Sequence, residues 1–230
     1  MEQETPLIQI DNVHKSFLMG REAVQALRGV SLDVARGEIV CLMGPSGSGK
    51  TTLLNIIGGL EEPSRGHVLV DGENIVALPE DALSEMRLTK MGFVFQSYNL
   101  LANFTARENI AVPLALAGLN RRERRDKVER LLESVGLADR AKHYPSELSG
   151  GQQQRVAIAR ALANDPPILI GDEITGDLDS ETGFEVMEVV AKLNHEQGTT
   201  IIYVTHDPRM AKFAERTIQL RDGRIKTSKV

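Results

Sequence analysis

The sequence predicts an α/β fold in which parallel strands covered by helices form the core, with an antiparallel β subdomain and an inserted α-helical subdomain attached to it. Three observations lead to this prediction. A buried strand at 38–43, a glycine-rich loop at 44–51 and a helix at 52–57 follow one another directly. Strands and helices alternate again from 168 to 204, which is typical of a parallel sheet. The residues from about 100 to 164 have helical periodicity.

The first third of the chain is rich in strand signals. Short apolar stretches occupy 7–10, 30–34 and 68–70, and the last of these ends at the turn Asp71-Gly72. We expect these strands, together with the strand at 38–43, to form a small sheet beside the ligand of the glycine-rich loop.

The glycine-rich loop fits the pattern G-x-x-x-x-G-K-[ST], which indicates a nucleotide ligand. Its residues are Gly44, Pro45, Ser46, Gly47, Ser48, Gly49, Lys50 and Thr51. The three glycines let backbone N–H groups approach a chain of phosphates, Lys50 reaches the β- and γ-phosphates, and the Thr51 hydroxyl ligates Mg²⁺. The helix that starts at 49–50 directs the positive end of its dipole at the phosphates.

The middle of the chain is predicted to be a helical insertion. The segment 122–135 places its apolar residues on one face and its charges on the other. We therefore treat 1–230 as a single domain. Its nucleotide-binding core with the β subdomain comprises 1–98 and 165–230, and its helical subdomain comprises 99–164.

The last third supplies the remaining strands and helices. It contains strands at 168–170 and 200–204 and a helix at 182–194. An antiparallel pair, 217–220 with 224–225, is joined through Asp222-Gly223.

Two carboxylates follow the strand at 168–170. Asp172 and Glu173 stand at its C-terminal end, where ligands gather in open α/β sheets. Asp172 suits the Mg²⁺ shell, through water. Glu173 suits a general base that polarises the attacking water.

A second glycine-rich helix start lies at Leu148-Ser149-Gly150-Gly151-Gln152, ahead of a helix at 153–163. Its serine is a good N-cap, and such helix starts bind anions. By chance this pentapeptide occurs in fewer than about one in a thousand chains of this size. One nucleotide does not need two such cradles.

The composition limits the possible partners and location. A hydrophobic content of 41%, a charged content of 26% and a net charge of −5 are ordinary for a soluble globular protein. A negative net charge does not indicate the basic surface that nucleic-acid binding usually requires, so we do not expect nucleic acid as a partner. Apolar stretches such as 110–119 are shorter than the ~20 residues that cross a bilayer, and no signal-peptide pattern is present. We expect a cytoplasmic chain, with the single Cys41 as a small core residue.

Six motifs in order resemble the ATP-binding subunit of ABC transporters over essentially the whole chain. The Walker A loop is 44–51, the signature is 148–152, and Walker B is 168–172 with Glu173 following. The remaining three are the Q-loop glutamine Gln96, the D-loop at 176–179 and the switch histidine His206. The residues at 26–30, 96–101 and 108–110 are most similar to those of the macrolide-exporter and lipoprotein-release subgroup.

The resemblance implies a P-loop NTPase (RecA-like) core and an ATP-hydrolysing motor that powers a separate membrane permease, exporting or extracting a peptide, drug or lipoprotein. It further implies a head-to-tail homodimer in the ATP-bound state, with each ATP between the Walker A loop of one subunit and the signature of the other. That arrangement accounts for the second cradle. Such a subunit uses ATP and Mg²⁺ and lies peripherally on the inner face of the membrane.

The resemblance also implies roles for individual residues. Glu173, His206 and Gln96 are the catalytic residues: Gln96 senses Mg²⁺ and the water while facing the permease, and His206 steadies the γ-phosphate. Phe17 stacks on adenine, with Val24 on the same face. Ser149 and Gly151 contact the γ-phosphate of the partner's site. The remaining nucleotide-binding positions are Thr52, Gly150, Gln152 and Asp179. The metal ligands are Thr51, Gln96 and Asp172.

Three residues depart from the family pattern. Ile174 stands where proline usually follows the catalytic glutamate, Gly171 replaces a common alanine, and Phe17 replaces a frequent tyrosine. Because proline stiffens a turn, we expect Ile174 to loosen Glu173, which would slow turnover but leave ATP binding intact.

Two other functions share these motifs. A transmembrane signalling or cell-division ATPase would drive an extracytoplasmic enzyme without transport, and this subunit's sequence does not separate it from a transporter. Chromosome-maintenance ATPases carry a long coiled coil between Walker A and the signature. Here Leu148 follows Lys50 by only 98 residues, without sustained heptads, which excludes that class.

Overall fold

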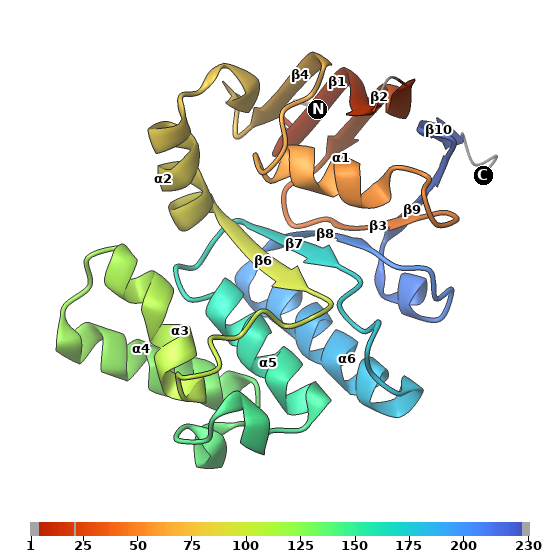
Figure 1. Cartoon of the computed structure of the whole chain (residues 1–230). Coiled ribbons are helices and arrows are strands. Elements are labelled where there is room, and N and C mark those ends of the chain that lie inside the picture. Colours follow the sequence, from red (N-terminus) through yellow and green to blue (C-terminus); the bar gives the residue numbers. More distant parts are fainter. Residues whose placement is uncertain (1–4, 21, 227–230) are drawn as a thin grey trace.

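The computed structural model describes residues 5–20 and 22–226, and its described strands form two sheets (Figure 1). The smaller sheet is antiparallel, with the order β2-β1-β4-β5. Its strands are β1 (Ile8–Met19), β2 (Glu22–Val34), β4 (Arg65–Val70) and β5 (Glu73–Asn74).

The larger sheet has the order β10-β9-β3-β8-β7-β6 and is parallel except for the pair β9–β10. Its strands are β3 (Ile39–Met43), β6 (Met91–Phe95), β7 (Ile168–Asp172), β8 (Thr200–Val204), β9 (Arg216–Arg221) and β10 (Arg224–Lys226). The α/β class with an added antiparallel sheet is thereby confirmed.

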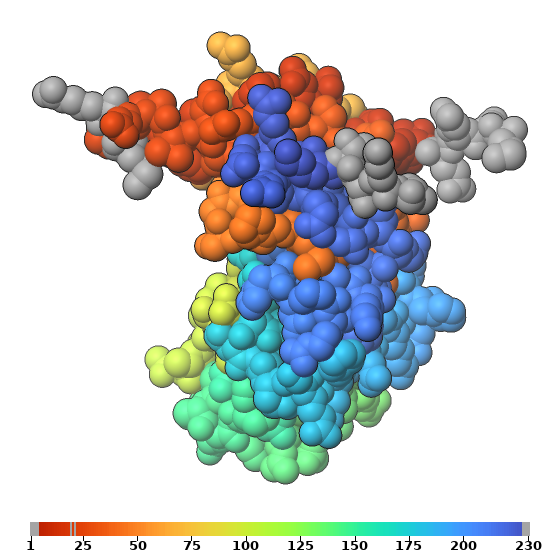
Figure 2. Space-filling model, turned by 90° about the vertical axis from the view of Figure 1, so that its right-hand side faces the viewer, coloured from red at the N-terminus to blue at the C-terminus, as the bar shows by residue number. Residues whose placement is uncertain are grey.

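Helices cover both faces of the larger sheet. They are α1 (Lys50–Ile57), α2 (Glu80–Lys90), α3 (Ala106–Leu116), α4 (Arg121–Ser134), α5 (Gly150–Ala161) and α6 (Ser180–Gln197). Short 3-10 turns lie at Ile75–Ala77, Ala138–Arg140, Pro145–Glu147 and Met210–Phe213. In Figure 1, α1 lies between the two sheets, whereas α5 and α6 lie on the opposite face of the larger sheet. Figure 2 shows the antiparallel sheet at one end of the molecule and the helices of the middle third at the other.

The side chains of the parallel strands divide between two hydrophobic cores. Ile170 and Ile202 belong to the core that α1 shares with the antiparallel sheet. Their neighbours Leu169 and Ile201 belong to the core under α3 to α6. Because successive side chains of a strand point to opposite faces, a strand between two cores has to be apolar at nearly every position. Cys41 is fully buried in this sheet, as predicted, and burial raises the pKa of its thiol to about 12.

The structure corrects one sequence prediction and adds two elements. The strand at 39–43 belongs to the parallel sheet and not to the small antiparallel one, in keeping with its unbroken apolar run. Helix α2 and strand β6 were not predicted. Met86 is the only buried residue of α2, so that helix has almost no apolar periodicity to detect. The helices expected for 99–164 are present as α3, α4 and α5, and the boundaries of that subdomain stay a prediction.

A buried asparagine fixes the chain between β6 and α3. Asn109 is 0% exposed, and its Oδ1 accepts a hydrogen bond from the Leu101 N–H at 2.8 Å. Its Nδ2 donates to the carbonyls of Leu101, Phe104 and Thr105 at 3.2, 3.0 and 3.1 Å. The carbonyls of Leu101 and Thr105 also accept from the backbone N–H groups of Phe104 and Asn109, so the side chain of Asn109 matters most for the Leu101 N–H and the Phe104 carbonyl.

We predict that Asn109→Ala lowers the free energy of unfolding by about 2 kcal/mol or more, because the Leu101 N–H and the Phe104 carbonyl lose their hydrogen bonds to this side chain and a fully buried side chain is truncated. Urea unfolding followed by circular dichroism measures this. Asn120→Ala is the control: the exposed Asn120 caps α4, and its loss should cost only about 1 kcal/mol. An Asn109→Ala variant that is as stable as the control would contradict the role of Asn109.

Candidate functional site

A cavity of about 490 Å³ brings together residues from five parts of the chain. Phe17 comes from β1, Ala26 from β2, 46–52 from the loop and the first turn of α1, Glu173 from the end of β7, and His206 from beyond β8. Apart from Ala26, all of them were predicted from the sequence as site residues.

The loop before α1 has the conformation of an anion-binding cradle. Gly47 and Gly49 have φ values of 74° and 101°, which favour glycine, and a Cβ at position 49 would lie 2.5 Å from the Ala26 carbonyl oxygen. No side chain caps α1, and its first turn holds no acidic residue. Its first N–H groups therefore remain available to an anion.

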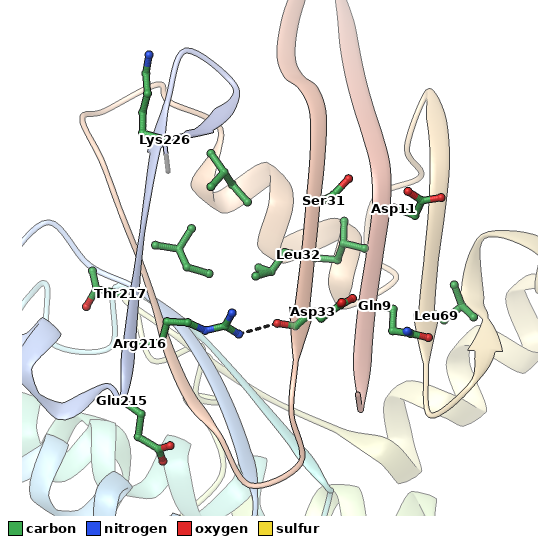
Figure 3. A pocket seen from close by; sticks show the side chains of 13 residues that line it. Gln9, Asp11, Ser31, Leu32, Asp33, Leu69, Glu215, Arg216, Thr217 and Lys226 are labelled. Atoms are coloured by element: carbon green, nitrogen blue, oxygen red, sulfur yellow. Dashed lines mark hydrogen bonds between the residues drawn. The ribbon is translucent and has the colours of Figure 1, made fainter. Parts of the chain in front are cut away.

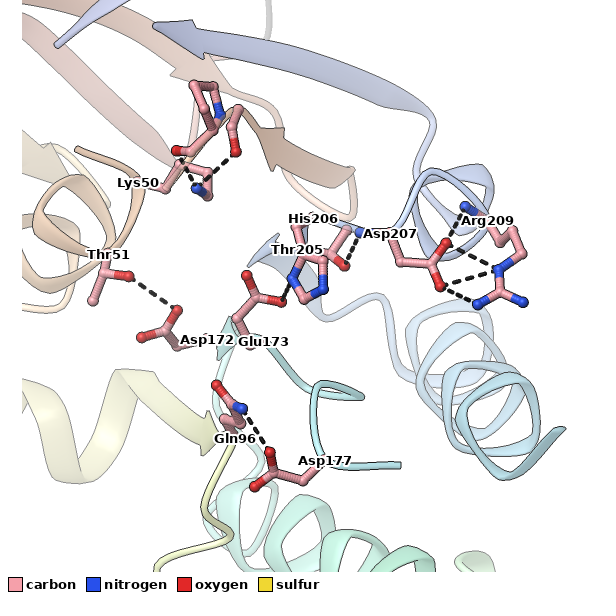
Figure 4. Close-up of polar contacts among 12 residues, drawn as sticks. Lys50, Thr51, Gln96, Asp172, Glu173, Asp177, Thr205, His206, Asp207 and Arg209 are labelled. Carbon is pink, nitrogen blue, oxygen red and sulfur yellow. Dashed lines mark hydrogen bonds and ion pairs between the residues drawn. The ribbon is translucent and has the colours of Figure 1, made fainter. Parts of the chain in front are cut away.

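Lys50 and Ser48 complete this cradle. The Lys50 Nζ donates to the carbonyls of Gly44 and Pro45 at 2.9 and 3.0 Å, so the ammonium group lies over the loop (Figure 4). The buried Ser48 Oγ has no hydrogen-bond partner within the described part of the chain. Both groups suit a phosphate ligand.

Asp172 faces the cradle from the end of β7. The Thr51 Oγ1 donates to the Asp172 Oδ1 at 3.2 Å (Figure 4). Burial raises the pKa of Asp172 above its usual value; the Thr51 hydrogen bond and the Lys50 charge oppose this shift, and the Glu173 charge adds to it. A carboxylate and a hydroxyl oxygen in contact are the ligands that Mg²⁺ prefers, so the residues present fit the predicted metal.

Glu173 and His206 form a pair beside the cradle. The His206 Nδ1 lies 3.0 Å from the Glu173 Oε2. Glu173 has a left-handed backbone, with φ of 51°, and its N–H donates to the Val204 carbonyl at 3.2 Å. Beyond His206, the Asp207 N–H donates to the Thr205 Oγ1 at 3.1 Å. The carboxylate is therefore held at the edge of the cavity by its backbone and by an imidazole.

Gln96 does not line the cavity. Its Nε2 donates to the Asp177 Oδ1 at 2.6 Å (Figure 4), and its side chain lies against Gly176. A role of Gln96 as metal ligand stays a prediction; it would use the Oε1, whereas the bond to Asp177 uses the Nε2.

The signature residues lie outside the cavity as well. Ser149 caps α5: its Oγ accepts from the Gln152 N–H at 3.3 Å, and its own N–H donates to the Gln152 Oε1 at 3.0 Å. A Cβ on Gly150 would lie 2.8 Å from the Tyr98 Oη. Since α5 and α1 lie on opposite faces of the larger sheet (Figure 1), the second cradle is separate from the first within one chain.

Three other predicted site residues have different surroundings. Phe17 pairs with Val24 across β1 and β2; Phe17 lines the cavity, whereas Val24 does not. The Lys15 Nζ lies 5.0 Å from the centre of the Phe17 ring. Asp179 caps α6, accepting from the N–H groups of Glu181 and Thr182 at 3.0 and 3.1 Å, and it does not line the cavity.

Sequence reasoning missed two residues of α5 that hold the site loops. The Gln154 Nε2 donates to the Ile174 carbonyl at 2.5 Å. The Arg160 guanidinium donates to the carbonyls of Tyr98 and Asn99, at 2.9 and 2.5 Å. Polar residues on a helix next to apolar ones are usually exposed, so no local signal separated these two from their neighbours.

A larger groove of about 900 Å³ lies between the two sheets, lined mainly by β1, β2 and β9 (Figure 3). At one end, the Arg216 Nη2 donates to the Asp33 carbonyl at 2.6 Å. None of the predicted site residues lines this groove.

Over the part of the chain that is described, no helix combines the length and the apolar character needed to cross a membrane.

Comparison with known proteins gives consistent matches. A family model described as ABC transporter matches residues 27–176. An uncharacterized ABC transporter ATP-binding protein of Thermotoga maritima is 50% identical over 219 residues, covering 95% of this chain and 93% of that protein. The macrolide export ATP-binding/permease protein MacB of Escherichia coli K12 is 47% identical over 96% of this chain. This chain spans only 34% of MacB.

Two solved structures resemble the whole chain. The dimeric structure of the cassette MJ0796, a protein of Methanocaldococcus jannaschii, has a TM-score of 0.89 and 48% identity, covering 95% of this chain and 96% of that one. A dimer of the same cassette in a post-hydrolysis state, bound to ADP and Pi, has a TM-score of 0.88 and 47% identity, with the same coverage.

We predict that Lys50→Ala raises the dissociation constant for ATP by about ten-fold or more, because it removes the cation that faces the phosphates. Titration calorimetry measures this. Lys192→Ala is the matched control: it removes the same charge from an exposed position on α6 and should bind ATP like the parent. Equal affinities of the two variants would contradict the role of Lys50.

Proposed function

The chain belongs to the ABC transporter family as an ATP-binding cassette, and on this basis we propose that it is the ATP-hydrolysing motor of a transporter with a membrane permease. The observation that carries the proposal is the single cavity lined by the phosphate loop, Glu173 and His206. Such a cavity places the phosphates of ATP next to a general base.

In this proposal the loop and Lys50 bind the phosphates, and Phe17 stacks on adenine. Thr51 and Asp172, whose oxygens are 3.2 Å apart, hold Mg²⁺ together with Gln96. When bound, Mg²⁺ neutralises the charge that develops on the phosphate oxygens. Glu173 accepts a proton from the attacking water, and His206 orients the Glu173 carboxylate, 3.0 Å away, as well as the γ-phosphate.

The active form is a homodimer. One chain leaves the signature residues outside its own cavity, and the related cassette MJ0796 has been solved as a dimer. We propose that Ser149, Gly150, Gly151 and Gln152 of one subunit close the cavity of the other, where their helix start faces the γ-phosphate. ATP then joins the two subunits, and its hydrolysis releases them.

A groove lined by apolar and charged residues, among them Phe95 directly before Gln96, is the proposed contact with the permease. It measures about 590 Å³ and lies between α2, β6 and the end of α3, with Leu60, Leu88, Phe93, Phe95 and Leu116 among its lining residues. Leu60 and Leu116 are 48% and 70% exposed, and exposed apolar patches of this kind mark interaction sites. A permease seated there would hold the chain at the inner face of the membrane. From the macrolide-export relatives we propose an exported peptide, drug or lipoprotein as cargo.

We predict that Glu173→Gln hydrolyses ATP at least about a hundred-fold more slowly than the parent, because the amide cannot accept the proton. It should form a stable dimer with ATP. Steady-state hydrolysis and size-exclusion chromatography with light scattering, run with Mg²⁺ and then without it, measure both effects.

The control is Glu188→Gln, which changes an exposed carboxylate on α6 and should behave like the parent. A Glu173→Gln variant that stays monomeric with ATP and hydrolyses it at the parental rate would refute the assignment of Glu173.

A further inference from the structure

We propose that Ile174 is a positioning residue for Glu173, and that Gly171 and Gln154 hold Ile174 in place. The inference rests on the proposed role of Glu173 as general base. It assigns a function to Gly171 and Ile174, the two positions around Walker B that the sequence analysis singled out.

The side chain of Ile174 occupies space that only a glycine at position 171 leaves free. Ile174 is 2% exposed. A Cβ at position 171 would lie 2.6 Å from the Ile174 Cγ1, closer still to its Cδ1, and 3.1 Å from the Tyr203 Cβ. The backbone of Gly171 is not left-handed, so this glycine is required by packing and not by its conformation. Gly171 and Ile174 therefore form one interlocking contact.

The main chain of Ile174 is fixed from the other side. Its carbonyl accepts the 2.5 Å hydrogen bond from Gln154, which is 0% exposed. Gln154 lies on α5, about one turn after the signature glycines. The residue after Glu173 is thus held by strand β7 through its side chain and by the signature helix through its carbonyl.

These contacts bear on the conformation of Glu173. A left-handed backbone is unfavourable for an L residue and persists only where its surroundings hold it. The Gly176 N–H donates to the Glu173 carbonyl at 2.9 Å, which closes the turn around Ile174. A shift of Ile174 would therefore move the Glu173 carboxylate away from His206 and from the attacking water.

The sequence alone leads to the opposite expectation, that isoleucine in place of proline loosens the base. The packing of Ile174 instead indicates that the turn after Glu173 is held rigidly. An Ile174→Pro variant separates these two expectations. If Ile174 holds Glu173 in place, the kcat of the variant falls several-fold. A kcat equal to or above that of the parent overturns the proposal.

Gly171→Ala tests the contact directly. We expect kcat to fall about ten-fold or more with little change in KM for ATP, because the phosphate loop is untouched. Adding Ile174→Ala removes the clash, so the double variant should be no slower than Gly171→Ala alone. Strictly additive losses would overturn the interlocking contact. The control is Gly183→Ala, a buried α6 glycine whose added Cβ would come no closer than 3.4 Å to another residue.

Two further readouts separate positioning from unfolding and from failure of the proposed function. Each variant is compared below its thermal midpoint, and Gly171→Ala is also placed in the Glu173→Gln background, where the ATP-bound dimer should still form. Loss of that dimer would mean a general structural defect and overturn the proposal. If Glu173→Gln alone behaves as expected while Gly171→Ala keeps the parental kcat, the positioning proposal fails and the proposed function stands.

Discussion

The parallel pairing of β3, β7 and β8 is the constraint on which the site depends. Leu42 and Asp172 both pair with Val204, so the phosphate loop after β3, the carboxylates at the end of β7 and the histidine after β8 all emerge at one edge of the sheet. Because neighbouring strands lie about 4.8 Å apart, side chains distant in sequence come within hydrogen-bond reach without further adjustment. A shift of the β7–β8 register by one residue would turn Asp172 to the other face.

Helix α5 connects this edge with the rest of the motifs. Its N-terminus presents the signature, its Gln154 holds the turn after Glu173, and its Arg160 holds the backbone that follows Gln96. Tyr98 and Asn99 have φ values of 57° and 49°, so Arg160 stabilises a pair of residues in an unfavourable conformation. The signature, the turn after Glu173 and the backbone after Gln96 are therefore all attached to one helix.

The sequence was informative where the chemistry is local. The turns Asp71-Gly72 and Asp222-Gly223 have φ values of 54° and 79°, and of 51° and 73°, as expected for such pairs at hairpin turns. The phosphate loop was equally predictable, since few residue types allow a backbone to surround an anion. Features set by tertiary packing were missed: the sheet to which β3 belongs, the weakly amphipathic α2, the contact of Gln96 with Asp177, and the fit of Ile174 against Gly171. The first three features depend on partners that are distant in sequence. The fit of Ile174 against Gly171 depends on a backbone conformation that no local sequence pattern specifies.

The central claim is that each ATP site is built from two subunits, and mixing two inactive variants tests it most directly. Lys50→Ala disables the phosphate loop, and Ser149→Arg disables the signature. In a mixed dimer with shared sites, one site receives both intact parts and the other receives both defects. Equal mixing should therefore restore roughly a quarter of the parental ATP hydrolysis, because about half of the dimers are mixed and each has one intact site. A mixture as inactive as either variant alone would contradict the shared site.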